Sequence, residues 1–151
     1  MAVPPIAASR DKRYRILIIE DDANIAKLIR FNLIQKGLEC RYAGDGAAGI
    51  AEFLASKPDL ILLDMMLPRM SGHDVCAKIR ETSTVPIILM TAANSEEAEM
   101  AAFRSGADDF ISKPFDITLL IARVMVHLRR VYRYDDMNKP SDEQKLGPGA
   151  S

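Results

Sequence analysis

Cysteines, excess charge and long apolar runs are all scarce in this 151-residue chain. The two cysteines, Cys40 and Cys76, lack the spacing of a metal or redox motif, so we interpret them as small buried side chains in a reducing compartment. The formal net charge of −1 argues against a nucleic-acid surface built on bulk positive charge. The apolar runs are too short to span a bilayer. The sequence therefore predicts neither direct nucleic-acid binding nor a membrane segment.

The two ends of the chain differ in composition from its middle. Prolines and polar residues interrupt the first segment, so no secretory signal is predicted and we expect a cytoplasmic protein. We expect residues 1–13 to form a flexible arm. Residues 134–151 are polar and rich in Pro, Gly and Ser, which is typical of a tail or linker. One domain is predicted over residues 14–133.

Apolar segments of strand length alternate with helical periodicity through this middle region. Strands are predicted at 15–19, 38–43, 59–63, 85–90 and 108–111. Apolar stripes predict helices around 25–33, 47–54 and 72–79, a fourth after Ser95 and a fifth over 117–131. The first, third and fourth strands are apolar almost throughout, as expected of strands covered on both faces. We therefore predict an α/β fold with a doubly wound, five-stranded parallel sheet and five helices.

Residues suited to phosphate and metal chemistry follow the predicted strands. The carboxyl ends of parallel strands share one edge of the sheet, where ligands bind. The residues expected there are Glu20, Asp21 and Asp22 after the first strand, Asp64 after the third, Thr91 at the end of the fourth, and Lys113 and Pro114 after the fifth. Clustered carboxylates repel one another unless a cation joins them, and Mg²⁺ prefers carboxylate, water and phosphate oxygens. A carboxylate can also act as a nucleophile and form an aspartyl-phosphate, whose oxygens a lysine and a hydroxyl can bind.

Four segments of the sequence resemble the receiver domain of two-component response regulators: ILIIEDDANIAKLI, DLILLDMMLPRMSGHDV, VPIILMTA and GADDFISKPFD. The resemblance covers residues 14–133 and keeps the motifs in the family's order. It implies a flavodoxin-like sheet of order 2-1-3-4-5 and a phosphorylation-dependent switch that receives its phosphoryl group from a histidine kinase or a phosphotransfer protein. It further implies a regulatory domain, not a metabolic enzyme, which catalyses only its own phosphotransfer and slow dephosphorylation.

The resemblance also assigns roles to the residues at the shared edge. Asp64 matches the phosphoacceptor. Its metal partners are implied to be Glu20, Asp21 and the backbone carbonyl of Met66, around Mg²⁺ or Mn²⁺ as a substitute. The remaining matches are Thr91 and Lys113 as phosphate-binding residues, Thr91 and Phe110 as switch residues, and Lys113–Pro114 as a cis peptide bond. Asp22 comes one position too late for the acidic pair and is expected to begin the first helix, where a negative charge suits the helix dipole.

The sequence departs from the family's pattern beside the phosphoacceptor. Met66 and Ala93 stand where some members carry polar or charged side chains that influence attack by water on the phosphoryl group. An apolar pair cannot position that water. The sequence therefore predicts a long-lived phosphoryl state.

A second departure concerns the face formed by the fourth helix, the fifth strand and the fifth helix. Asp109, Arg123 and Arg130 match charged positions that the transcription-factor branch uses for dimerisation, but Leu119 replaces an acid of that branch. A homodimer through this face and a face of solvated surface charges are both open interpretations.

Three other functions account for part of the sequence. A pseudo-receiver would use the same fold as a constitutive interaction module without phosphorylation. Gly44, Gly46 and Gly49 form a G-x-G-x-x-G pattern of dinucleotide-binding folds, but Asp45 places a negative charge in the supposed phosphate loop. The bland interpretation of these glycines is a turn with small residues for close packing. A phosphatase of the dehalogenase type would need an acid two residues after Asp64, where Met66 stands.

Overall fold

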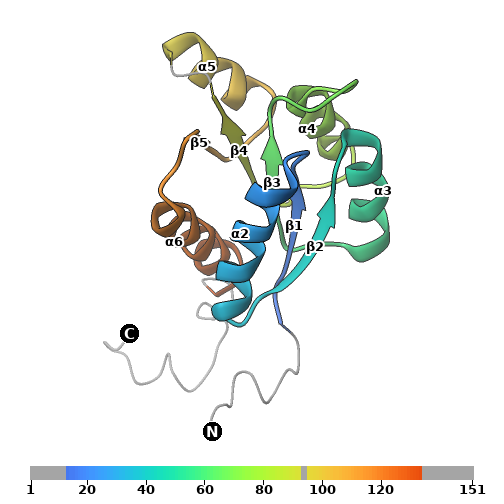
Figure 1. Cartoon of the computed structure of the whole chain (residues 1–151). Helices are drawn as coiled ribbons and strands as arrows, with labels where there is room; N and C mark the ends of the chain where they lie inside the picture. Colours follow the sequence, from blue (N-terminus) through green and yellow to red (C-terminus); the bar gives the residue numbers. More distant parts are fainter. Residues whose placement is uncertain (1–12, 93–94, 134–151) are drawn as a thin grey trace, which may run out of the picture.

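The structure is a computed structural model, which describes residues 13–92 and 95–133. Strands and helices alternate along this part of the chain (Figure 1). Their bounds are β1 (Arg15–Ile19), α2 (Ala23–Gln35), β2 (Glu39–Ala43), α3 (Gly46–Ser56), β3 (Leu60–Asp64), α4 (Gly72–Arg80), β4 (Ile87–Thr91), α5 (Glu96–Arg104), β5 (Asp109–Ser112), α6 (Ile117–Leu128) and the π-helical turn η1 (Arg129–Arg133). The fourth and fifth predicted helices are therefore α5 and α6. The predicted tail (134–151) and all of the predicted arm (1–13) except Arg13 lie outside the described residues.

The strands form one parallel sheet of order β2-β1-β3-β4-β5. This confirms the doubly wound α/β fold and its five helices within the described residues. The chain reverses direction across the sheet at β1, because β2 lies on one side of β1 and β3 on the other. The carboxyl ends of β1 and β3 are therefore neighbours at a topological switch point, where α/β sheets bind ligands.

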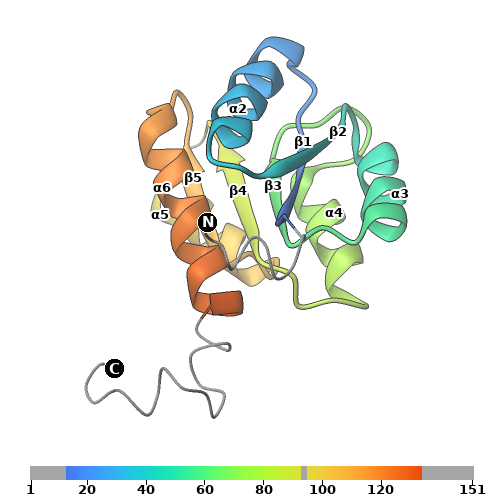
Figure 2. The same cartoon turned by 90° about the horizontal axis from the view of Figure 1, so that it is seen from below.

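Two apolar layers cover the sheet because alternate side chains of each strand point to opposite faces. Ile16 and Ile18 pack with α2 and α6, whereas Leu17 and Ile19 pack with the layer that contains α3, α4 and Ala102 of α5. Figure 2 shows α2 and α6 on one side of the strands and α3 and α4 on the other. Strands β1, β3 and β4 are buried almost throughout, as their apolar composition predicts. None of the described helices has the length and apolar character needed to cross a membrane.

The helix faces differ from the predicted apolar stripes at five positions. The stripes placed Leu28, Ala47, Ala51, Leu54 and Val131 inward, but all five are exposed. In α2 the buried line is Ala26, Ile29 and Leu33, and Leu28 lies about 100° around the helix from Ile29, which turns it towards solvent. The predicted fifth helix also changes character, because α6 ends at Leu128 and the wider turn η1 follows. The predicted strand bounds are off by at most two residues.

Short polar side chains begin four of the helices. An aspartate or serine accepts a hydrogen bond from a backbone N–H of the first turn at Asp22, Asp45, Ser71 and Asp116. These bonds satisfy donors that have no partner within the helix. The expectation that Asp22 begins the first helix is thus confirmed.

Two glycines in the first turns of α3 serve close packing. A Cβ atom on Gly46 would lie 2.9 Å from Val75 Cγ2, and one on Gly49 would lie 2.6 Å from Ile19 Cδ1. Both glycines therefore allow α3 to approach its neighbours more closely than any other residue would. This confirms the bland interpretation of the G-x-G-x-x-G pattern.

A polar and aromatic network closes the amino-terminal end of the sheet. Arg15 donates to both carboxylate oxygens of Glu39, at 3.0 and 3.3 Å, and to the carbonyl of Ser56. The backbone N–H of Arg15 donates to Asp59 Oδ2 at 2.7 Å. Tyr132 of η1 donates its hydroxyl to the Asp59 carbonyl at 2.8 Å, and its ring stacks on that of Tyr14 with centroids 5.4 Å apart. The turn after α6 is thereby tied to the segment that enters β1.

Candidate functional site

Three carboxylates meet at the carboxyl end of the sheet. Glu20 and Asp21 follow β1 directly, and Asp64 is the last residue of β3. One carboxylate oxygen from each of the three lies within 4.8 Å of the other two. Glu20 and Asp64 are buried, at 0% and 2% exposure, while Asp21 is exposed. The fold thus concentrates negative charge at a place that solvent reaches from the Asp21 side.

One ammonium group lies against this cluster. Lys113, in the turn after β5, donates from Nζ to Glu20 Oε1 at 2.9 Å and lies 3.3 Å from Asp64 Oδ1. Its backbone N–H donates to the carbonyl of Thr91 at 2.7 Å, which joins this turn to the end of β4. The Lys113–Pro114 peptide bond is cis. Strands far apart in sequence therefore bring three acids and one lysine together.

Both carboxylate oxygens of Glu20 have partners. Oε1 accepts from Lys113, and Oε2 accepts from the backbone N–H of Asp22 at 3.1 Å. Burial is the main cause that raises the pKa of Glu20; the two hydrogen bonds oppose it, and the charge of Asp64 adds to it. The charged form of Glu20 is therefore held at a free-energy cost.

Lys113 responds to the same surroundings in the opposite sense. Burial alone would lower the pKa of Lys113, but the hydrogen bond to Glu20 and the charges of Asp64 and Glu20 together outweigh it and raise the pKa. Lys113 has two acids beside it, Glu20 and Asp64. Each of these acids has only Lys113 as a cationic neighbour and has other acids close by. Lys113 therefore stays protonated, and the cluster keeps an excess of negative charge.

The backbone around Asp64 is tightly packed. Asp64 Oδ1 accepts from the N–H of Met66 at 3.2 Å, which directs the carboxylate over the turn that follows β3. A Cβ atom on Gly72, the first residue of α4, would lie 2.6 Å from the Asp64 carbonyl oxygen. The Gly72 N–H donates to the Met65 carbonyl at 2.9 Å. Helix α4 therefore rests directly on the backbone of Asp64.

The predicted switch residues lie on β4 and β5, the two strands that follow β3 in the sheet. Thr91 ends β4 and is buried. Phe110 of β5 is half-buried and meets Phe103 of α5 edge to face, with ring centroids 5.6 Å apart and planes at 75°. The side chain of Met66 is 72% exposed at the site. The other half of that predicted pair, Ala93, lies outside the described residues.

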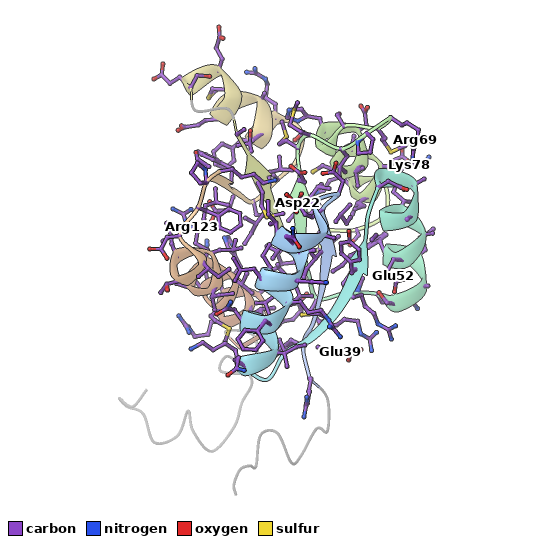
Figure 3. All side chains as sticks on the ribbon, in the orientation of Figure 1. Asp22, Glu39, Glu52, Arg69, Lys78 and Arg123 are labelled. Carbon is purple, nitrogen blue, oxygen red and sulfur yellow. The ribbon has the colours of Figure 1, made fainter. Side chains whose placement is uncertain are left out.

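Two of the charged residues predicted on the α5–β5–α6 face, Asp109 and Arg123, pair with each other. Arg123 donates to Asp109 Oδ1 at 2.7 Å, and His127 Nε2 lies 3.0 Å from Asp109 Oδ2. Leu119 and Arg130 are exposed beside them. Arg123 projects from α6 on the side of the molecule away from α3 and α4 (Figure 3). Whether the face binds a second copy stays a prediction.

Sequence reasoning missed one residue that contacts the site. Tyr42 of β2 donates its hydroxyl to the backbone carbonyl of Glu20 at 2.8 Å. No motif marks this tyrosine. The signal that could have found it is strand register, because Tyr42 pairs with Ile18, two residues before Glu20.

The cluster has the donor set that a hard divalent cation requires. Its ligand atoms are carboxylate oxygens from two adjacent strand ends, with one open side at Asp21. Mg²⁺ favours a few carboxylates completed by water and phosphate oxygens. The residues present therefore fit Mg²⁺, and the cation would offset charge that Lys113 alone does not balance.

Comparisons with known proteins agree on one family. Residues 16–125 match the model of the response regulator receiver domain. The chain is 41% identical over 133 residues to the sensory transduction protein RegX3 of Mycolicibacterium smegmatis, covering 88% of this chain and 58% of the relative. It is 40% identical over 137 residues to the DNA-binding dual master transcriptional regulator RpaA of Synechocystis. This match covers 89% of this chain and 57% of the relative.

Solved structures show the same similarity. A two-component response regulator from Clostridium difficile superposes with a TM-score of 0.77 at 33% identity, covering 80% of this chain and 99% of that one. A Francisella receiver domain superposes with a TM-score of 0.75 at 29% identity, and the match covers 78% of this chain and 98% of that one. The chain spans only about half the length of the curated relatives it matches.

Proposed function

Because this chain belongs to the response regulator receiver domain family, we propose that it is a phosphorylation switch in which Asp64 accepts a phosphoryl group from a phosphohistidine of a histidine kinase or phosphotransfer protein. The observation that carries the proposal is the cluster itself. Three carboxylates lie within 4.8 Å, and one lysine contacts two of them. A purely structural site would neutralise buried charge more completely than this.

The proposed ligand set combines the carboxylate cluster with the Met66 carbonyl that the family resemblance implies. Asp21, Asp64 and the backbone carbonyl of Met66 would hold Mg²⁺, with Glu20 close by through its buried carboxylate. When bound, the cation would neutralise charge on the phosphoryl oxygens and on Asp64. Glu20 has both oxygens engaged by Lys113 and the Asp22 N–H, so we propose that it acts mainly by positioning that lysine and by adding negative charge.

The proposed reaction forms one bond to phosphorus and breaks another. Asp64 Oδ1 is already engaged by the Met66 N–H and by Lys113, so we assign the attack on phosphorus to Oδ2. The P–N bond to the donor imidazole breaks, and its electron pair stays with the imidazole nitrogen. Lys113 then binds a phosphoryl oxygen as a point charge.

The proposed switch passes from the site to the α5–β5–α6 face. The Thr91 hydroxyl moves towards the new phosphoryl oxygens, and Phe110 turns inward into the space that Thr91 leaves. Phe110 would then lose its edge-to-face contact with Phe103 of α5. A local charge change would thereby shift the population of two surface states that a partner or a second copy reads.

Beryllofluoride with Mg²⁺ tests this function directly. We expect the amide spectrum of the wild-type chain to shift around Thr91, Phe110 and α5 in the presence of both reagents. An Asp64→Asn variant is expected to show no such shift. A wild-type spectrum that does not respond, or responds identically in the variant, would support the pseudo-receiver and rule out the switch.

The lifetime of the phosphoryl group is a separate prediction. Met66 is largely exposed and apolar beside Asp64, so its side chain cannot position an attacking water through hydrogen bonds. We expect the phosphorylated chain to persist far beyond seconds when Mg²⁺ is present, and a Met66→Gln variant to lose its phosphoryl group faster. Decay measured by intact mass spectrometry checks both; a wild-type half-life of seconds would contradict the prediction.

A further inference from the structure

We propose that Tyr42 is a positioning residue of the metal site, because its hydroxyl fixes the peptide group that links Glu20 to Asp21. This inference rests on the proposed Mg²⁺ site and adds a residue to it. Tyr42 lies near the carboxyl end of β2, a strand that supplies none of the three carboxylates but lies beside β1. Its hydroxyl donates to the Glu20 carbonyl at 2.8 Å, a normal length for a strong O–H···O bond.

The neighbouring strand thus holds Glu20 by both of its backbone groups. The Glu20 N–H donates to the carbonyl of Ala43 at 3.1 Å, and the Glu20 carbonyl accepts from Tyr42. The first bond continues the β1–β2 ladder, but the second lies beyond it and comes from a side chain. The plane of the Glu20–Asp21 peptide is therefore set by the phenol.

That peptide plane matters because of where Asp21 lies. Glu20 and Asp64 are buried and held by Lys113, whereas Asp21 is exposed. Repulsion from two buried carboxylates favours an Asp21 side chain turned outward. Fixing the preceding peptide limits this movement and keeps the Asp21 oxygen within 4.8 Å of the others.

The surroundings of the phenol support the assignment. Tyr42 is 44% exposed, so its contact with Glu20 is not a consequence of burial in the core. Gly44 leaves room for it, since a Cβ atom there would lie 3.3 Å from the hydroxyl oxygen.

The chain contains a matched control for this contact. Tyr132 also donates its hydroxyl to the backbone carbonyl of an acidic residue at 2.8 Å, but at the opposite end of the sheet, on Asp59. Tyr42→Phe and Tyr132→Phe therefore remove the same chemical bond at two distances from the carboxylates. Only the first is expected to change metal binding.

Isothermal titration with Mg²⁺ alone, on the full chain, tests the proposal. We expect Tyr42→Phe to raise the Mg²⁺ dissociation constant by about threefold to tenfold, which corresponds to one lost hydrogen bond. Tyr132→Phe should leave the constant unchanged while lowering stability to urea. An unchanged constant in Tyr42→Phe, or an equal rise in both variants, would overturn the positioning role. Absence of Mg²⁺ binding by the wild-type chain would instead overturn the proposed function on which the inference rests.

Discussion

The two ends of the sheet hold similar residue types in opposite electrostatic conditions. At the amino-terminal end, Arg15 pairs with Glu39 and its backbone binds Asp59. At the carboxyl end, three acids lie together and one lysine contacts two of them. Figure 3 labels Glu39 near the amino-terminal end of the sheet and Asp22 near its carboxyl end. The comparison indicates that one end is balanced for stability, whereas the other retains excess charge that a cation and a phosphoryl group can use.

Two glutamates make the contrast concrete. The hydrogen bond from Arg15 is the main cause that lowers the pKa of Glu39. Burial is the main cause that raises the pKa of Glu20, despite its contact with Lys113. The same side chain therefore favours its charged form at one end and resists it at the other.

The largest expected effect comes from breaking the balanced end. Arg15→Met should lower the free energy of unfolding by about 2 kcal/mol, because it leaves Glu39 and the Ser56 carbonyl without their half-buried partner. Urea denaturation measures the loss. Arg41→Met is the matched control, because exposed Arg41 contacts the same carboxylate at 3.6 Å. It should lower the free energy of unfolding by only a few tenths of the amount expected for Arg15→Met. Equal losses would show that the network at this end has no special role.

Mg²⁺ should bind at the carboxyl end of the sheet, which keeps excess negative charge, and should leave the amino-terminal end unchanged. At roughly ten times its dissociation constant, Mg²⁺ is expected to raise the free energy of unfolding by about 1.4 kcal/mol, because it binds the folded state. Asp21→Asn should reduce this gain, and Arg15→Met should preserve it. Thermal unfolding with and without Mg²⁺ gives the comparison. A gain that survives Asp21→Asn would place the cation elsewhere.

Replacing one aspartate by asparagine should change the free energy of unfolding in opposite directions at the two ends of the sheet. Without Mg²⁺, Asp64→Asn is expected to stabilise the fold by about 1 kcal/mol, because relief of repulsion from Glu20 and Asp21 exceeds the lost attraction to Lys113. Asp59→Asn should destabilise it, since the carboxylate there accepts from the Arg15 N–H. Urea denaturation in a chelating buffer measures both. The same sign for both variants would remove the distinction between the ends.

The smallest effects are expected from pH. The ordinary pKa of a glutamate here is 4.5. Because the folded pKa of Glu20 is raised, its contribution to stability declines as pH rises from 4.5 through that pKa. Because the folded pKa of Glu39 is lowered, its contribution is present above 4.5 and is lost as pH falls through that pKa.

Two neutral variants separate these contributions. Without Mg²⁺, Glu20→Gln should abolish the decline above pH 4.5, and Glu39→Gln should abolish the loss below it. Unfolding free energies across this range, taken as wild type minus variant, provide the measurement. Slopes of the same sign at both ends would contradict the assigned pKa directions.

Sequence patterns predicted the fold because burial on both faces leaves a direct record in composition. Strands β1, β3 and β4 are nearly all apolar, and the acids and lysine stand where such strands end. The helix faces were harder, because Leu28 has the spacing of a core residue yet lies beside the buried line. The Tyr42 contact was missed because it depends on the register between β1 and β2, which the apolar pattern does not give. The wide turn η1 was missed too; it includes Tyr132, whose stack with Tyr14 joins residues far apart in the sequence.

The stack of Tyr14 on Tyr132 has a practical consequence for labelling. The stack lies between the exposed residues Arg13 and Val131, at the end of the sheet that faces away from Asp64. A donor and acceptor dye placed at these two positions would lie close together without covering the carboxylates. Energy transfer between them would then report whether η1 stays against the segment that enters β1, while the opposite end remains accessible to a phosphodonor.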